Sequence, residues 1–309
     1  MNNSRSALLK TLAFHTIWNH APTQAEWINT LESRDFDLDK EEVLCEIKNL
    51  TDSGDVVLRY GRFVFPDKME LLDEQRNNEI WNSRKMRTAR IVTKWLSHLS
   101  SVRFVALCNT TAHGHARNNA DLDFFIITRA GRIMTTRALA VLPFKLMRKR
   151  PTSGHEQDAI CLSYFITDDG LDLSSHMLDS SDAGPRTPDR DIYFRYWFLS
   201  LLPLYDDGIS TELWNSNRQI IECHPFSRPW ISPPDLRVKQ PKLRIPISSK
   251  FESPAKNLQT RAFPLQIRDL MNKDTRVMVT DKVLKFHVQD GRAQYLNEYR
   301  SECRSRGLT

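Results

Sequence analysis

The 309-residue chain lacks the cysteine pattern of a disulfide framework or a zinc site. Its five cysteines are odd in number, and no two of them form a Cys-x-x-Cys pair. Cys108 and Cys161 lie within apolar runs. We therefore expect five reduced thiols in a cytoplasmic protein, rather than disulfides or a bound zinc ion.

Long apolar runs and several well-known catalytic motifs are also absent. No stretch approaches the roughly 18 consecutive apolar residues of a membrane span, and no charged-then-apolar signal pattern begins the sequence. The chain has no P-loop, no G-x-G-x-x-G, no H-E-x-x-H, no nucleophile elbow and no internal repeat. We expect neither a membrane protein nor a member of the enzyme classes that those motifs define.

The composition is that of a folded protein with a mild basic excess. Hydrophobic residues make up 40% and charged residues 27%, which is enough apolar material for real cores. At roughly 100–200 residues per domain, the length predicts two domains or three small ones. The net charge of +6 permits a nucleoside triphosphate, nucleic acid or another polyanion as partner, without selecting among them.

Residues 1–66 predict three helices followed by a β-hairpin, which is the order of a winged helix. Thr23 and Glu26 have the spacing of a capping box at the start of the second helix. The third helix, beginning after Asp39, is rich in acidic residues and would repel phosphates. We therefore expect a packing or protein-contact module and do not expect DNA binding.

The rest of the chain divides into a connecting helix at 67–100, an α/β core at 101–180 and a helical region at 187–309. The connecting helix has a basic face that we expect to be solvated, and Thr187-Pro188 is a good helix start for a segment reaching Leu202. Residues 225–265 are rich in proline and basic residues and predict a linker or extended arm. Strands are expected at 103–107, 122–128 and 159–166, and a helix at 131–147 whose terminal cations complement its dipole.

The residues that indicate chemistry are Asp121 and Asp123, at the start of an almost continuously apolar strand. Residues two apart in a strand point to the same side, so both carboxylates should face one point. Converging carboxylate oxygens suit Mg²⁺, which bridges triphosphate oxygens in phosphoryl-transfer enzymes. A capping or surface acidic pair is the alternative role for these two residues.

This order resembles the DNA-polymerase-β-type nucleotidyltransferase superfamily. That motif has a Gly-Gly or Gly-Ser pair, about ten residues, and then Asp, an apolar residue and Asp or Glu. The resemblance is closest to bacterial and archaeal nucleotidyltransferase-domain proteins with an N-terminal winged-helix-like part. It covers roughly residues 5–225, through matches at 121–128, 131–132, 160–165, 191–203 and 214–217. It implies an α+β fold: a small mixed-sheet core flanked by a winged-helix-like domain and a C-terminal helical region.

The sequence departs from that pattern in the phosphate loop and in the third acid. Asn109-Thr110 stands where the family has Gly-Ser. Asn tolerates the left-handed backbone region that glycine adopts there, and Thr110 keeps a hydroxyl. The third carboxylate should lie on the strand at 160–165, which has none, and Ser163 is the position expected to face the site. Glu156 and Asp158 precede that strand and are poor substitutes.

Nucleotide contacts are expected from the loop and from the helix after it. Asn109 and Thr110 would hold the phosphates, with Arg117 and Arg132 as further contacts. His113 and His115 flank Gly114 and are assigned a structural role in the loop, because no third metal ligand has a suitable spacing.

Three functions remain open at this point. The resemblance implies transfer of a nucleoside monophosphate from a triphosphate, first of all ATP, to the hydroxyl of an unidentified acceptor. The C-terminal region would supply the acceptor pocket. The alternatives are an impaired relative that only binds a nucleotide or a protein, and a DNA-binding regulator, against which the acidic third helix argues.

Overall fold

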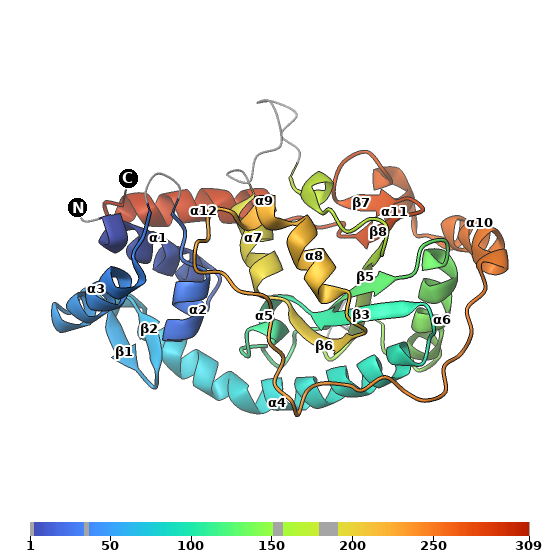
Figure 1. The fold of residues 1–309 in the computed structure, drawn as a ribbon, viewed down its shortest axis with the longest axis horizontal. Coiled ribbons are helices and arrows are strands. Elements are labelled where there is room, and N and C mark those ends of the chain that lie inside the picture. Colours follow the sequence, from blue (N-terminus) through green and yellow to red (C-terminus); the bar gives the residue numbers. More distant parts are fainter. Residues whose placement is uncertain (1–2, 34–36, 151–156, 179–190, 309) are drawn as a thin grey trace.

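The computed structural model describes residues 3–33, 37–150, 157–178 and 191–308, which form an α+β protein (Figure 1). Its centre is a mixed six-stranded sheet with strand order β6-β3-β4-β5-β8-β7. β4 and β5 are parallel and are joined by helix α6 (Ile133–Leu146), whereas the other neighbours are antiparallel. The strands are β3 (Val102–Leu107), β4 (Leu122–Thr128), β5 (Ile160–Thr167), β6 (Leu202–Asp206), β7 (Val277–Val279) and β8 (Val283–Phe286).

Helices cover both faces of this sheet. The long helix α4 (Glu70–Ser97) and α6 pack on one face through a core that includes Val92, Phe124 and Phe144. On the other face, aromatic residues of α7 (Ile192–Leu199) pack against Phe104, Phe125 and Tyr164. The same face is covered by α8 (Ser210–Ser216) and α9 (Arg218–Ile221). Burial on both faces explains why β4 is a nearly continuous apolar run.

The N-terminal region has the predicted order of three helices and a hairpin. Thr23 caps α2 (Gln24–Asn29) in a capping box with Glu26, and Asp39 caps α3 (Lys40–Asp52), so both predicted helix starts are confirmed. The remaining elements are α1 (Asn3–Ile17), β1 (Val57–Arg59) and β2 (Arg62–Val64).

The C-terminal third differs from the purely helical region that the sequence predicted. Three of its segments are strands of the central sheet (β6, β7 and β8), and Leu202 begins β6 instead of ending a helix. The expected extended arm contains helix α10 (Glu252–Ala262). Helices α11 (Leu265–Leu270) and α12 (Arg292–Ser305) confirm two segments that looked helical in the sequence. Helix α12 returns to pack on α1, where Cys303 and Leu308 join the N-terminal core.

Short helices and boundaries complete the description. Helix α5 (Asn109–Ala112) follows β3, and 3-10 turns span Pro66–Lys68, Ser174–His176 and Ser249–Phe251. The predicted helix start at Thr187-Pro188 and the acid Glu156 lie outside the described residues. Among the helices described, none is long and apolar enough to cross a membrane.

Candidate active site

Asp121 and Asp123 lie together at the entrance to β4, as their two-residue spacing predicts. One carboxylate oxygen from each, together with the Cys161 sulfur, lies within 4.8 Å of the others. Cys161 comes from β5, where it is the register partner of Asp123. Parallel pairing through the α6 crossover therefore brings three candidate ligand atoms from two strands to one point.

Asn109 contacts this group directly and has a left-handed backbone conformation. Its φ is +59°, in the left-handed region that Asn tolerates better than other non-glycine residues. Its side-chain amide donates a hydrogen bond to Asp123 Oδ2 at 2.6 Å, and its Oδ1 accepts one from the Tyr193 hydroxyl at 2.9 Å. Asn109 thus connects α7 to the acidic pair. Thr110 contributes a backbone carbonyl that accepts from the His115 amide at 3.3 Å.

The carboxylate of Asp123 is largely shielded from solvent, which disfavours its ionised form. Burial raises the pKa of its carboxyl group, while hydrogen bonds from Asn109 and Cys161 act in the opposite direction. A cation beside the carboxylate would favour the ionised form and relieve this penalty. The same carboxylate raises the pKa of the Cys161 thiol, although burial is the larger cause, so this thiol keeps its proton.

The position of the missing third acid is occupied by small polar side chains. Cys161 stands beside Asp123, and its thiol lies 3.2 Å from the Ser163 hydroxyl. Ser163 faces the site as predicted, because it lines a cavity beside Asp123. Its Oγ lies 3.4 Å from His287 Nε2. Asp158 is held elsewhere by an ion pair to Lys85 at 2.8 Å and another to Arg84 at 2.6 Å. Among the described residues, the candidate ligand group beside Cys161 therefore has two carboxylates, those of Asp121 and Asp123.

A cavity of about 230 Å³ opens beside Asp123 and is closed by the C-terminal segment. Its wall includes Tyr193 and Trp197 from α7 and residues 285–292 from β8 and the loop that follows it. The wall of this cavity beside Asp123 thus comes in large part from α7, from β8 and from the segment that follows β8.

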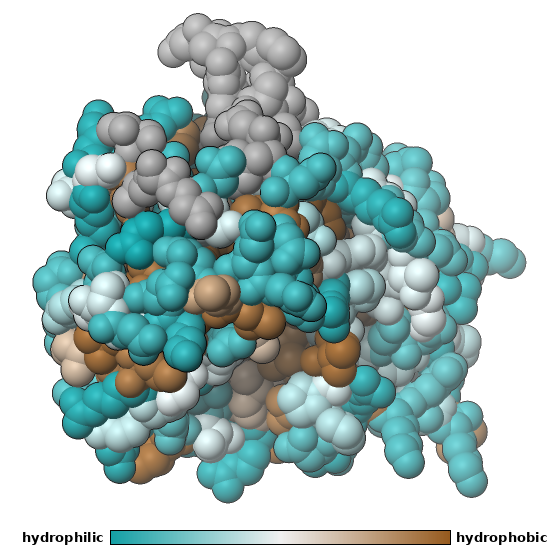
Figure 2. All heavy atoms as spheres, turned by 60° about the vertical axis from the view of Figure 1, so that its left-hand side comes forward, coloured by the Kyte–Doolittle hydropathy of each residue, from teal (hydrophilic) through white to brown (hydrophobic). Residues whose placement is uncertain are grey.

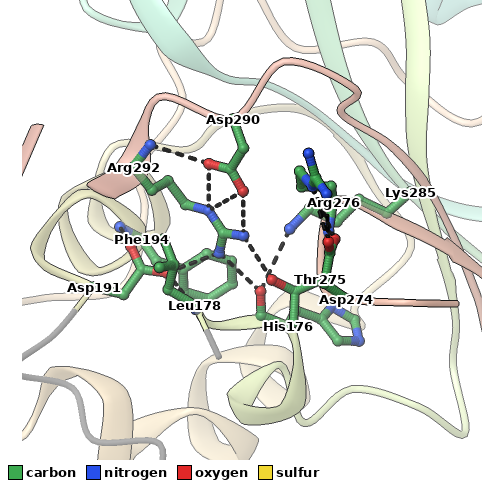
Figure 3. A network of polar contacts seen from close by, with 10 residues as sticks. All are labelled: His176, Leu178, Asp191, Phe194, Asp274, Thr275, Arg276, Lys285, Asp290 and Arg292. Atoms are coloured by element: carbon green, nitrogen blue, oxygen red, sulfur yellow. Dashed lines mark hydrogen bonds and ion pairs between the residues drawn. The ribbon is translucent and has the colours of Figure 1, made fainter. Parts of the chain in front are cut away.

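Arg292 fixes this closing segment in place (Figure 3). Its guanidinium donates to Asp191 Oδ2 at 2.8 Å, to Asp290 Oδ2 at 2.6 Å, to Thr275 Oγ1 at 2.8 Å and to the His176 carbonyl at 3.0 Å. Asp191 is 1% exposed and also caps α7 by accepting from the Phe194 amide. One buried arginine therefore connects the closing segment to the start of the helix that carries Tyr193.

Lys285 is the second cation of this wall. Its side chain is buried at 2% exposure and points its ammonium toward the His176 carbonyl, 3.4 Å away. Burial, together with the smaller effect of the neighbouring Arg292, lowers its pKa to about 7. A near-neutral amine therefore lines the same cavity as Asp123.

The two arginines predicted to bind nucleotide do not line this cavity. Arg117 is exposed and lies 3.4 Å from Glu74 of α4. Arg132 donates to the backbone carbonyls of Ile247 and Ala130 beside the start of α6.

Sequence analysis missed three side chains of the site: Cys161, Lys285 and Arg150. Arg150 was assigned to the cationic end of α6, but it turns back to donate to the Ile160 carbonyl at 2.8 Å. Burial lowers its pKa, and the charges of Cys161 and Asp121 oppose that shift, which places this cation beside the acidic group. Only Cys161 had a usable signal, because it precedes Ser163 by two residues on the same strand. Comparison with known proteins adds no assignment, since no family model, no curated protein and no solved structure matches this chain.

Proposed function

We propose that this protein is a Mg²⁺-dependent nucleotidyltransferase that transfers a nucleoside monophosphate from a triphosphate, first of all ATP, to a hydroxyl of an unidentified acceptor. The observation that carries the proposal is the convergence of Asp121 and Asp123 beneath Asn109, whose φ is +59°. The mixed sheet with a parallel β4-α6-β5 unit supports a small nucleotidyltransferase core. The preceding helices and hairpin support a winged-helix-like domain.

The acidic pair fits Mg²⁺, whereas the thiol beside it does not. Mg²⁺ takes oxygen ligands and is usually bound through one or two carboxylates plus substrate phosphates. Cys161 keeps its proton and acts as a hydrogen-bond donor in this arrangement, not as a metal ligand. Bound Mg²⁺ would neutralise charge that develops on the triphosphate during transfer.

Each of the other polar residues has a distinct role in this proposal. Asn109 orients Asp123 and is itself held by Tyr193. Lys285, neutral in part near pH 7, accepts the proton of the acceptor hydroxyl, the role that a third carboxylate would otherwise have.

A binding module without catalysis is the second candidate, and three observations favour it. β5 carries Ser163 where a carboxylate was expected to face the site, and the Asn109 amide already occupies an oxygen of Asp123. The cavity of about 230 Å³ is also smaller than the roughly 300–1,000 Å³ typical of ligand pockets. Such a protein would bind a nucleotide or a partner protein without transferring a group.

Mass spectrometry of the full-length protein separates the two candidates. The protein is incubated with mixed NTPs, Mg²⁺ and candidate acceptors, and products are searched for the added mass of one NMP. Asp121→Asn with Asp123→Asn should abolish transfer, whereas Asp281→Asn, at an exposed carboxylate, should not change it. Calorimetric binding of ATP and Mg²⁺ without any NMP transfer would reject the enzyme and support the binding module.

A further inference from the structure

Four histidines that are far apart in the sequence meet between the N-terminal helices and the loop that follows α5. His15 lies in α1 and His20 just after it, while His113 and His115 lie in the loop between Asn109 and Asp121. The His20 ring centre is 4.8 Å from that of His113 and 5.0 Å from that of His115. The rings of His113 and His115 are 5.8 Å apart. The fold thus supplies the further ligand that no spacing in the sequence could indicate.

Most ring nitrogens of this cluster have no hydrogen-bond partner among the described residues. The Nδ1 of His20, the Nε2 of His113 and both nitrogens of His115 have none. His20 and His115 are only 1% and 5% exposed. Buried polar atoms are nearly always hydrogen-bonded, so several unpartnered nitrogens in one place require an explanation such as a bound ion. The nearest charged group is the Glu26 carboxylate, 3.4 Å from His20 Nε2.

Burial opposes protonation of the two loop histidines: it lowers the pKa of His115 to about 3 and that of His113 well below its ordinary value, and the neighbouring His20 lowers both. His15 is partly satisfied, since its Nε2 lies 2.8 Å from the Thr30 hydroxyl.

The distances between the rings agree with coordination of a single ion. A Zn–N bond of about 2.0–2.1 Å places the metal about 3.2 Å from each ring centre. A tetrahedral angle then separates the ring centres by about 5.2 Å. The three observed separations of 4.8, 5.0 and 5.8 Å lie on both sides of this value. The ring nitrogens of the three histidines do not yet converge within 4.8 Å of one another, so binding of an ion requires the rings to turn toward a shared centre.

We propose that His20, His113 and His115 bind one divalent transition-metal ion of the zinc class. His20 coordinates through Nδ1, and its Nε2 is oriented by Glu26, as carboxylates commonly orient metal-binding histidines. The fourth position faces a cavity of about 640 Å³, which both His113 and Glu26 line. This cavity lies against the N-terminal helices, on the side shown in Figure 2, where hydrophobic residues gather around a hollow.

This site is independent of the proposed nucleotidyl transfer but acts on the same loop. His113 and His115 are on the loop whose first residue, Asn109, contacts Asp123. An ion bound to both histidines and to His20 would attach that loop to the N-terminal helices. The metal would therefore order the loop without touching the acidic pair.

Titration of the metal-stripped, full-length protein with Co²⁺ and then Zn²⁺ tests the proposal. We expect one ion per chain, with the ligand-field absorption of a tetrahedral Co²⁺ centre that Zn²⁺ displaces. His113→Gln and His115→Gln should each weaken binding by more than about 100-fold. His98→Gln, at an exposed histidine on another part of the surface, should bind like the original protein.

Two further measurements exclude the other clusters and misfolding. Asp121→Asn should retain the site, and the Co²⁺ spectrum should lack a thiolate-to-metal band, because the Asp121–Asp123–Cys161 and Glu32–Cys223–His224 groups each contain sulfur. Without metal, the His113→Gln and His115→Gln variants should unfold at the same temperature as the original protein. Addition of Zn²⁺ should raise the unfolding temperature of the original protein and leave that of the two variants unchanged. A chain that binds no Zn²⁺, or loop variants that titrate like the original protein, would overturn the proposal.

Discussion

Replacing Lys285 by methionine should make the protein more stable and less active at the same time. The lysine is 2% exposed, and among the described residues its ammonium makes a single long hydrogen bond, 3.4 Å to the His176 carbonyl. Methionine has a similar length and keeps the packing of the stem against the ring of Tyr164, over which the ammonium lies. The change therefore removes a buried charge without creating a large cavity.

The shift in the Lys285 pKa sets the size of the effect. Burial lowers this pKa from 10.5 to about 7, and each unit corresponds to about 1.4 kcal/mol of difference between the protonation states. Keeping the ammonium in this site thus costs on the order of 4 kcal/mol. Loss of the weak hydrogen bond offsets about 1 kcal/mol of the gain. We expect Lys285→Met to raise the free energy of unfolding at pH 7 by about 2–4 kcal/mol.

The effect must also depend on pH in one direction. Between about pH 7 and 10.5 the unfolded chain binds this proton and the folded chain does not, so the stability of the original protein rises with pH. Below pH 7 both states bind the proton and the full penalty is present. The advantage of Lys285→Met should therefore be largest at pH 6–7 and decline by about 1.4 kcal/mol per pH unit above that.

Urea unfolding at several values between pH 6 and 9 measures this dependence, and NMP transfer at pH 7.5 measures activity. Lys282→Met is the matched control, because Lys282 is exposed and its loss should change stability by less than about 0.5 kcal/mol. A Lys285→Met protein that is less stable than the original, or more stable by the same amount at every pH, would refute the reasoning. Full transfer activity in that variant would show that Lys285 does not accept the proton.

Three other substitutions test the site. Asp123→Asn should abolish transfer. In the absence of metal it should also raise the free energy of unfolding, because burial raises the pKa of this carboxyl group and the ionised form is penalised at neutral pH. The transfer assay measures the first effect and thermal unfolding the second. Asn109→Gly with Thr110→Ser should raise transfer by freeing Asp123 Oδ2, and a decrease in rate would show that the loop was aligned wrongly. Arg292→Ala should destabilise the fold by about 3–5 kcal/mol in urea unfolding, since it leaves a buried aspartate unpaired, and a change under 1 kcal/mol would contradict this role.

Local features of this fold could be predicted because neighbouring residues determine them. The capping box of Thr23 and Glu26 needs only a three-residue spacing, and the cap at Asp39 needs only one acceptor before a helix. The convergence of Asp121 and Asp123 follows from the two-residue period of a strand. The positive φ of Asn109 agrees with the tolerance of Asn for the left-handed region.

Features that depend on distant pairing could not be predicted in this way. β7 and β8 have three and four residues, and they are strands because β8 pairs with β5, more than 110 residues earlier in the chain. Lys85 was expected on a solvated face, yet its side chain is fully buried. Its ammonium donates to Asp158 and to the carbonyls of Asn118 and Ala120, which satisfies the charge inside the protein. Arg87, Arg90 and Lys94 of the same helix are exposed as expected. The helical periodicity of the sequence therefore did not distinguish the buried Lys85 from these exposed basic residues.

The loop between β3 and β4 connects both candidate sites, and its two ends are held by different parts of the molecule. At one end Asn109 joins Asp123 to Tyr193, and at the other Lys85 of α4 binds the carbonyls of Asn118 and Ala120 beside Asp121. The middle of the loop faces the N-terminal helices through its histidines. The acidic pair is therefore positioned by contacts from regions that the sequence presented as separate domains. One loop thus joins the N-terminal helices to the segment that carries Asp121 and Asp123.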